Sequence, residues 1–268
     1  VVITYEPAVG KTYSYKVETD ALSDAVISGQ TSSSHEKSVD EIDMTVEKVD
    51  DSEIAIKTLF KSSDSGTFVN GQYEKNTEEN ELIGQYLTVY IDKNDGTMKK
   101  WEGLEDLEYD ESGMSMGDMI ANNFAAITFN FFPNEPIKVG SKWNAMNKTT
   151  TEREDGKDVE DVREKIYEVT DFLLKDNRKC MKCKISLKID VTNDRIVTTD
   201  DGEEIDVKAS GKGEGEGDVL FDFENGIVVE SNLAWMVEVV QNFKNLNTGE
   251  EDGFEIYQEM HEKYTLVK

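Results

Sequence analysis

Two cysteines, Cys180 and Cys183, stand at the spacing that redox enzymes and zinc sites use. A C-x-x-C pair does disulfide chemistry when it begins a helix, because the helix N-terminus stabilises the thiolate. Here Cys183 instead shares an alternating apolar pattern with Met181 and Ile185, and a period of two is typical of a strand. Cysteines three apart on a strand point to opposite faces, beyond disulfide reach. We therefore expect two free thiols, with Cys183 in the core and Cys180 incidental.

The other residues that could do chemistry form no catalytic motif. No second Cys or His pair stands at zinc-site spacing. The two histidines are His35, in a polar and loop-like stretch, and His261, on a strand, and neither belongs to a G-x-S-x-G or H-E-x-x-H motif. Carboxylates are so abundant that any pair of them is uninformative. The sequence therefore predicts no catalytic, cofactor-binding or metal-binding residue, and no enzyme.

Calcium is the one metal that we weigh further. Asp92-Lys93-Asn94-Asp95-Gly96 resembles the start of an EF-hand loop, but it is one residue short and no glutamate follows in register. A hairpin turn is the favoured interpretation, with calcium as the alternative.

The glycine-rich run from Gly211 to Gly217 contains acids that would repel phosphate. That run indicates a close-packed or strongly bent strand.

The charge of the chain restricts its partners. Fifty-seven acidic residues face twenty-nine basic ones, a formal net charge of −28. This charge disfavours nucleic acids and anionic membranes. It indicates a solvated, soluble surface, with high-salt adaptation or cation recruitment as alternatives.

Apolar runs are too short for a transmembrane segment, and the N-terminal Val1-Val2-Ile3-Thr4 has no signal-peptide pattern, so we expect a mature form.

Alternation of apolar and polar residues dominates the chain. It is seen in Tyr13–Val17, Leu87–Ile91, Val219–Phe223 and Glu255–Tyr264. Turn-forming residues separate such runs: Asp50-Asp51-Ser52, Asn94-Asp95-Gly96, Asp200-Asp201-Gly202, Asn225-Gly226 and Thr248-Gly249. Asn-Gly and Asp-Gly favour type I′ hairpins, in which both central residues have positive φ. The sequence therefore predicts a mainly β fold of antiparallel meander sheets.

One segment has a helical pattern instead. Met116, Met119, Ile120, Phe124 and Ile127 follow helical spacing. Ser115 precedes them and Asp118 stands three residues later, which is close to a capping box. We expect one short helix near 115–126.

Two blocks of sequence resemble each other. Val9-Gly10-Lys11-Thr12-Tyr13 aligns with Val139-Gly140-Ser141-Lys142-Trp143, 130 residues later, and each block follows Glu-Pro. The same offset aligns Val89–Asp92 with Val219–Asp222. Between them, Ile54, Ile56 and Thr58 match Ile185, Leu187 and Ile189 at an offset of 131.

This duplication predicts the organisation of the chain. Residues 1–112 form a first β repeat, 113–130 a helical connector and 131–268 a second β repeat; one continuous domain is the alternative. The repeats would form two curved sheets or half-barrels. Gly10 and Gly140 permit positive φ before each sheet begins. Tyr13 and Trp143 are then structural anchors in the core.

The block from Phe131 to Trp143 carries a family resemblance. Its Pro-x-x-Val-Gly-x-x-Trp strand entry resembles an uncharacterised family of bacterial secreted lipoproteins, as does the opening strand from Gly10 to Tyr15. About twenty residues match closely. The resemblance implies export and a β-rich fold similar to the half-barrels of lipoprotein carriers, and it supplies no catalytic residues. The lipid-modified cysteine of such proteins is absent, so either the sequence begins after it or this member is not lipidated.

Two functions remain after these exclusions. The favoured one is a structural or adhesive component of the cell surface or of an extracellular assembly, which implies a protein partner or self-association. The alternative is a binding module that holds an apolar or amphiphilic ligand on a concave sheet, with the helix as a plug. A cavity would favour binding, whereas a flat apolar patch or an unpaired edge strand would favour assembly. Either function implies an extracytoplasmic location.

Overall fold

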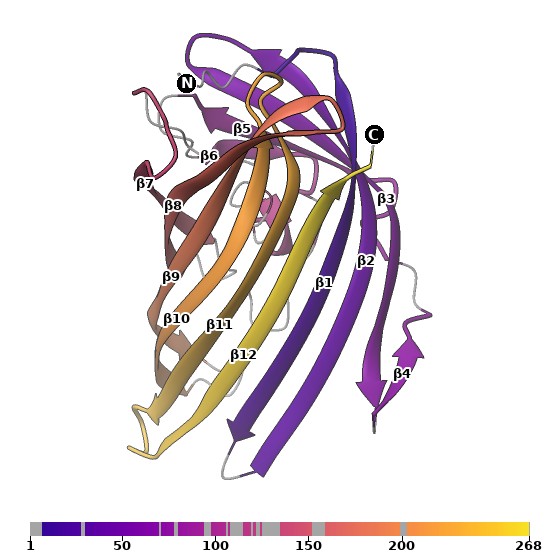
Figure 1. Ribbon diagram of the computed structural model, residues 1–268. Coiled ribbons are helices and arrows are strands. Elements are labelled where there is room, and N and C mark those ends of the chain that lie inside the picture. The colour runs from indigo at the N-terminus through magenta and orange to yellow at the C-terminus, as the bar shows by residue number, and fades with distance from the viewer. Residues whose placement is uncertain are drawn as a thin grey trace.

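The computed structural model describes residues 7–27, 30–69, 71–77, 80–93, 98–105, 107, 115–118, 120–121, 124, 135–151, 159–198 and 203–267. The prediction of a mainly β, antiparallel meander is confirmed (Figure 1). The strands are β1 (Thr12–Ile27), β2 (Gln30–Val49), β3 (Glu53–Val69), β4 (Gln72–Lys75), β5 (Tyr86–Asp92), β6 (Met98–Glu102), β7 (Lys142–Thr151), β8 (Val159–Lys175), β9 (Arg178–Thr198), β10 (Glu204–Asp222), β11 (Ile227–Asn245) and β12 (Glu251–Leu266).

The strands join into one 12-stranded sheet. Its order is β6-β5-β3-β2-β1-β12-β11-β10-β9-β8-β7, and β4 pairs with β3 outside this path. The first and last strands, β1 and β12, pair near the middle of the sheet, where Tyr15 lies opposite Leu266. β6 and β7 are the two ends of the described ladder.

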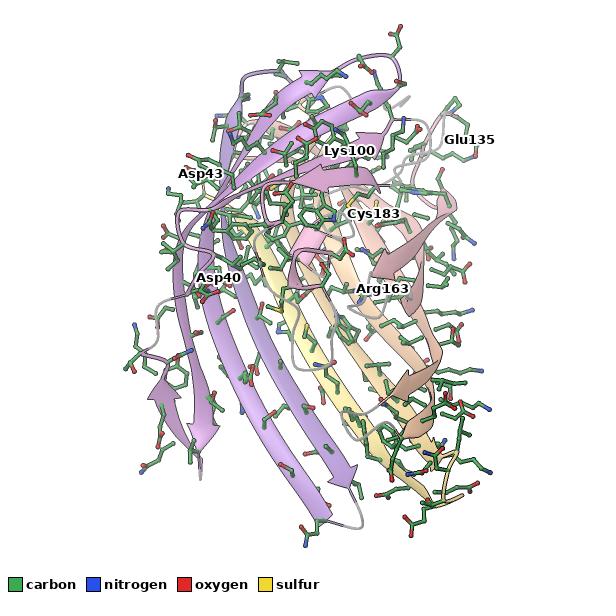
Figure 2. All side chains as sticks on the ribbon, turned by 180° about the vertical axis from the view of Figure 1, so that it is seen from behind. Asp40, Asp43, Lys100, Glu135, Arg163 and Cys183 are labelled. Carbon is green, nitrogen blue, oxygen red and sulfur yellow. The ribbon has the colours of Figure 1, made fainter. Side chains whose placement is uncertain are left out.

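The sheet is a strongly curved wall with a helical segment on its inner side (Figure 2). Among the described residues, 116–118, 120–121 and 124 are helical. Ser115 caps this segment, because its Oγ accepts a hydrogen bond from the Asp118 backbone N–H at 3.2 Å. The remaining residues of the predicted helix, which include Met119, lie outside the described ones, and so does Ile127. We call the face of the sheet that contacts this helix the inner face.

Strand alternation places the core on the inner face. One buried cluster contains Tyr13, Ile42 and Ile56 and packs against Ile120 and Phe124 of the helical segment. A second cluster lies on the other half of the sheet and consists of the following buried residues: Ile137, Trp143, Tyr167, Val169, Met181, Cys183, Ile185, Leu187, Ile189, Val219, Phe221, Val228, Leu233, Trp235 and Val237. The core is thus divided between the two halves of one sheet.

Two five-strand units share the same ladder. We call β1, β2, β3, β5 and β6 the first repeat and β7 to β11 the second. Gly10 donates its N–H to Val46 O at 2.7 Å, and Gly140 donates to Val169 O at 2.8 Å. Val46 lies opposite Ile56, and Val169 lies opposite Cys183. These pairs occupy the same places in the two units.

The bulges repeat as well. β2 and β8 each bulge immediately after Val46 and Val169, respectively. The first repeat has another bulge between Tyr90 and Ile91, and the second has one between Leu220 and Phe221, again 130 residues later. Among the described residues, no strand of the first repeat corresponds to β12, which lies between β1 and β11.

The predicted match of Ile54 with Ile185 is wrong. By register, Ile56 corresponds to Cys183, so the offset within β3 and β9 is 127 and not 131. The two offsets differ by four residues. A shift by an even number leaves the same side chains on the inner face, so the apolar pattern cannot distinguish these alignments.

The turns follow the sequence only in part. Asp50 closes its predicted turn, because its Oδ1 accepts hydrogen bonds from the N–H groups of Ser52 and Glu53. Asn225-Gly226 does not form a two-residue turn, since β10 and β11 are joined by the four residues 223–226. A two-residue turn with positive φ at both positions lies at Asp176-Asn177, between β8 and β9, where no turn was predicted from the sequence. Asp and Asn tolerate this conformation better than other non-glycine residues.

Candidate functional site

A cavity of about 220 Å³ lies between the inner face of the first repeat and the helical segment. The sheet contributes Val17, Ile42 and Phe60, and the helical segment contributes Ile120 and Phe124. The rings of Phe60 and Phe124 meet edge to face, with centroids 5.4 Å apart. We call this space the inner-face cavity, and its walls are mainly apolar.

Two carboxylates line the same cavity. Asp40 of β2 lies opposite Val17, and Glu262 of β12 lies opposite Thr19, so the two carboxylates flank β1. Their strands are two spacings apart, on the order of 10 Å. The Ser38 hydroxyl donates a hydrogen bond to Asp40 at 2.9 Å. Within the described part of the chain, neither Asp40 nor Glu262 forms an ion pair, and no Lys, Arg or His lines the cavity.

The pKa values of two residues at this end of the cavity, Glu262 and Tyr264, are raised. Burial raises the pKa of Glu262, and the positive charges of Arg163 and Lys165 partly oppose this effect. Burial also raises the pKa of Tyr264, and the negative charges of Glu262 and Asp40 raise it further. The polar end of the cavity is therefore acidic and partly shielded from solvent, with Asp40 and Glu262 half-buried.

The second repeat carries basic residues at the corresponding positions. Arg163 and Lys165 occupy in β8 the places that Asp40 and Ile42 occupy in β2, since Arg163 lies opposite Asn147 and Asp40 lies opposite Val17. Lys165 is 6% exposed, and burial lowers its pKa to about 8, helped by the neighbouring charge of Arg163. The Arg163 guanidinium lies 5.8 Å from the centre of the Trp235 ring. The two repeats thus carry opposite charge on the same face.

The glycine run packs closely against its neighbour. Gly213, Gly215 and Gly217 lie opposite Val237, Trp235 and Leu233 on β11. A Cβ added at Gly215 would stand 2.6 Å from the Trp235 Cβ, closer than such atoms approach. The expected close-packed strand is confirmed. The glycines leave room for the large inner-face side chains on either side.

The predicted anchors lie at the start of each repeat. Gly10 and Gly140 have φ of +79° and +85°. Tyr13 is 3% exposed and Trp143 8%. Trp143 stacks on Tyr167, with centroids 5.3 Å apart. Their placement is that of core residues, and their contribution to stability stays a prediction.

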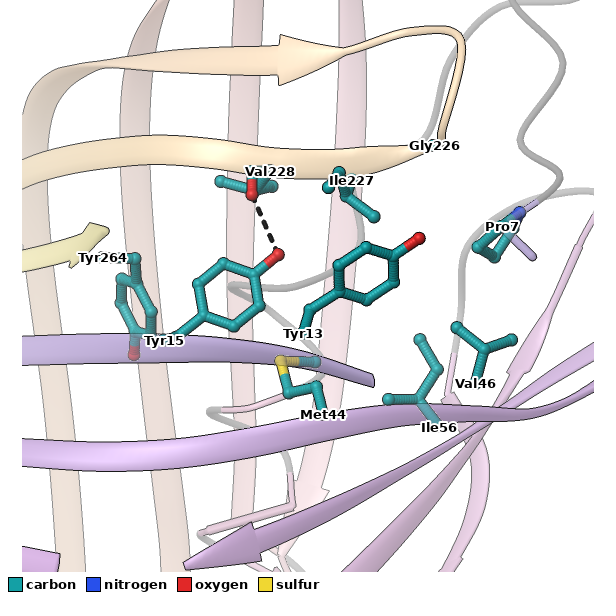
Figure 3. A pocket seen from close by; sticks show the side chains of 10 residues that line it. All are labelled: Pro7, Tyr13, Tyr15, Met44, Val46, Ile56, Gly226, Ile227, Val228 and Tyr264. Atoms are coloured by element: carbon teal, nitrogen blue, oxygen red, sulfur yellow. Dashed lines mark hydrogen bonds between the residues drawn. The ribbon is translucent and has the colours of Figure 1, made fainter. Parts of the chain in front are cut away.

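Tyr13 also faces a smaller pocket where the first repeat meets β11 (Figure 3). The Tyr15 hydroxyl donates a hydrogen bond to the Val228 carbonyl oxygen at 2.8 Å across this junction. The Tyr13 hydroxyl is buried and has no hydrogen-bond partner in the described structure. The pocket holds only about 30 Å³, and a single water needs about 10–15 Å³, so it is too small for an organic ligand.

The cysteines are both free and lie on opposite faces of β9. Cys183 is in the inner-face core, and burial raises its pKa to about 12. Cys180 is not incidental, because it is fully buried on the outer face against Leu220 and Val229. Burial raises the pKa of Cys180 as well. Neither environment favours a reactive thiolate.

The histidines lie outside the cavity. His35 is on strand β2 and not in a loop, because its polar stretch pairs residue by residue with β1. Its Nε2 is 2.7 Å from Asp20, and its ring stacks on Phe68 with centroids 4.4 Å apart. His261 Nε2 is 2.6 Å from Asn232 Oδ1. Polar residues formed a strand here because both faces of this part of the hairpin are solvated, so no apolar alternation was needed.

The calcium alternative has no cluster to support it within the described chain, where no three His, Cys, Asp or Glu residues converge. Asp92 is described and pairs with Lys99 at 2.9 Å, whereas residues 94–97 lie outside the described ones.

Among the residues that the structure describes, no helix has the length and apolar character needed to cross a membrane.

Comparisons with known proteins leave the family open. No family model and no curated protein matches this chain. Among solved structures, the COG4313 outer membrane channel from Pseudomonas putida F1 is similar at 9% identity and a TM-score of 0.27, covering 98% of each chain. Pseudomonas aeruginosa OccK2 (OpdF), solved with glucuronate, is similar at 7% identity and a TM-score of 0.24, covering 98% of this chain and 100% of that one. Likeness at this level carries no argument about function.

Proposed function

We propose that this chain is a non-enzymatic binding protein that holds the apolar part of an amphiphilic ligand in the inner-face cavity. The observation that carries the proposal is the cavity itself, with apolar walls and polar groups at one end. Ligand sites are typically concave and mainly apolar, with a few polar groups that fix orientation. The sequence favoured a surface component, and the cavity is the reason to prefer its alternative.

The size of the cavity favours a slender ligand. A space of about 220 Å³ is below the range of about 300–1,000 Å³ that is typical of small-molecule pockets. One alkyl chain would fit along the sheet surface of Val17 and Ile42, with its end against the contacting rings of Phe60 and Phe124. The polar end of such a ligand would then lie near Asp40 and Glu262.

Displacement of a neutral apolar dye tests this proposal. N-phenylnaphthylamine should fluoresce on binding to the chain, and dodecanol should displace it. Ser63→Phe places a ring in the cavity wall and should abolish binding. Ser65→Phe, two residues further along β3 and outside the cavity lining, is the matched control and should bind normally. Equal dye binding by both variants would contradict the proposal.

The second candidate is the surface or adhesive component, and the edge strand β7 favours it. β7 is the last strand of the described ladder and spans Lys142–Thr151, long enough to add a strand from another chain. Sedimentation equilibrium over a wide concentration range should then show self-association. A monomer at every concentration would contradict self-association through this edge.

We also propose an extracytoplasmic location, supported by the resemblance of the strand entry at Val139–Trp143 to secreted lipoproteins. Fractionation of cells that express the natural gene should place the protein in the envelope or the medium. Recovery with the cytoplasmic fraction would contradict the proposal.

A further inference from the structure

The described residues that line the inner-face cavity carry charge of one sign only. Asp40 and Glu262 are its two ionisable acids, and none of the lining residues in the described chain is basic. Both lie on the inner face by strand register, on either side of β1. We infer that the ligand is a cationic amphiphile of the alkylamine class, whose ammonium group binds between Asp40 and Glu262. This inference rests on the proposed function.

The geometry allows one ligand to reach both parts of the site. Val17 and Ile42 form the sheet surface beside Asp40, and Tyr264 lies beside Glu262 on the same face of β12. An alkyl chain that runs toward Phe60 and Phe124 therefore leaves its polar end at the two carboxylates. Charge-assisted hydrogen bonds from an ammonium group are stronger than those from a hydroxyl.

The basic residues of the second repeat do not supply this pairing. Arg163 and Lys165 act on Glu262 electrostatically, but they lie on β8 and do not line the cavity. Asp40 accepts a hydrogen bond from the neutral Ser38 hydroxyl. A carboxylate headgroup would stand beside two like charges that are half-buried, where repulsion is stronger than in bulk water. The site therefore selects against fatty acids.

Three ligands with the same chain separate the effect of charge from that of the tail. Dodecylamine, dodecanol and dodecanoic acid are titrated against the wild-type chain in the dye-displacement assay. Dodecylamine should bind at least about tenfold more tightly than dodecanol, which corresponds to about 1.4 kcal/mol. Dodecanoic acid should bind more weakly than dodecanol.

Charge-removing variants locate the preference. Asp40→Asn with Glu262→Gln should reduce the ratio of dodecylamine affinity to dodecanol affinity about tenfold. Glu41→Gln with Glu259→Gln removes two charges from the outer face of the same strands and is the matched control. Because the chain carries a net charge of −28, this control measures general attraction of amines to an acidic protein.

The outcomes distinguish the two proposals. If dodecanol binds and dodecylamine is not preferred, or if the control pair lowers the preference as much as the cavity pair, the inference of a cationic ligand is overturned and the binding function remains. If none of the three ligands displaces the dye, both are overturned. A preference that disappears only in the cavity pair supports the inference.

Discussion

The first and second repeats share a ladder of hydrogen bonds and differ in what they place on its inner face. The first carries Asp40 and Ile42 and leaves a cavity beneath the helical segment. The second carries Arg163 and Lys165 at the same register, together with a glycine strand packed under Trp235. Bulges and turns thus maintain the backbone, while inner-face side chains diverge. The proposed binding function depends on that divergence and not on the shared fold.

The largest expected effect tests the anchors that open each repeat. Trp143→Ala should lower the free energy of unfolding by about 3–5 kcal/mol, because it removes a buried ring that stacks on Tyr167. Tyr13→Ala should cost a similar amount. Tyr13→Phe should cost nothing or stabilise slightly, because the Tyr13 hydroxyl is buried without a hydrogen-bond partner in the described structure. Urea denaturation measures all three. An unchanged midpoint for both Ala variants would refute the anchor interpretation.

A second comparison concerns two aspartates at equivalent positions, Asp222 and Asp92. Asp222 is fully buried, pairs with Arg178 at 3.2 Å and accepts hydrogen bonds from the N–H groups of Glu224 and Asn225. Asp222→Ala should cost about 3 kcal/mol, because it breaks a buried network. Asp92→Ala should cost at most about 1 kcal/mol, because its pair with Lys99 is more exposed. Thermal unfolding of both variants measures the two losses of stability. Equal losses would contradict the expected asymmetry.

The glycine strand should tolerate substitution on one face only. Gly215→Ala should destabilise by about 1–3 kcal/mol, because its Cβ would meet Trp235. Glu214→Ala, on the opposite face of the same strand, should change stability by no more than about 0.5 kcal/mol. In the first repeat Leu87 stands where the second has Gly217, so that repeat does not need the same space. Chemical denaturation in parallel measures the difference, and equal losses would show that the strand has room for a side chain.

The smallest expected effect depends on pH. Burial raises the pKa of Glu262 in the folded state, so its ionised form is disfavoured there. The stability that Glu262 contributes is present below its ordinary pKa of 4.5 and is lost as pH rises through the raised pKa. Glu262→Gln should therefore be the more stable chain at neutral pH and lose that advantage in acid. Melting temperatures of both chains across pH measure this, and a constant difference would show that Glu262 does not titrate abnormally.

Much of the ladder could be predicted from the sequence, because strands that are buried on one face alternate. Tyr13 and Val17 were placed correctly by this rule, and the Asp50 turn was placed by its turn-forming residues. The His35 segment was missed because both of its faces are polar and solvated. The Asp176-Asn177 turn carried a usable signal in two adjacent residues that accept positive φ, but it lacks the glycine that draws attention to such turns.

The candidate site could not be predicted in the same way. Glu262 and Asp40 are two of fifty-seven acidic residues, and nothing local marks them as facing a cavity. Their proximity depends on the pairing of β1 with both β2 and β12, and the second of these pairings joins distant parts of the chain. Only the helical segment near Phe124, with its aromatic and methionine content, indicated that the inner face was covered.

The pairing of β1 with β12 also governs when the protein can finish folding. β12 follows every other described strand in the sequence, yet it lies between the two repeats in the sheet. During synthesis, one edge of β1 stays unpaired while β2 to β11 leave the ribosome, and an unpaired edge is a template for joining another chain. The junction also has a large sequence separation, which slows folding. Nascent chains that lack β12 are therefore the species most exposed to misassembly, and the last strand made is the one that ends this exposure.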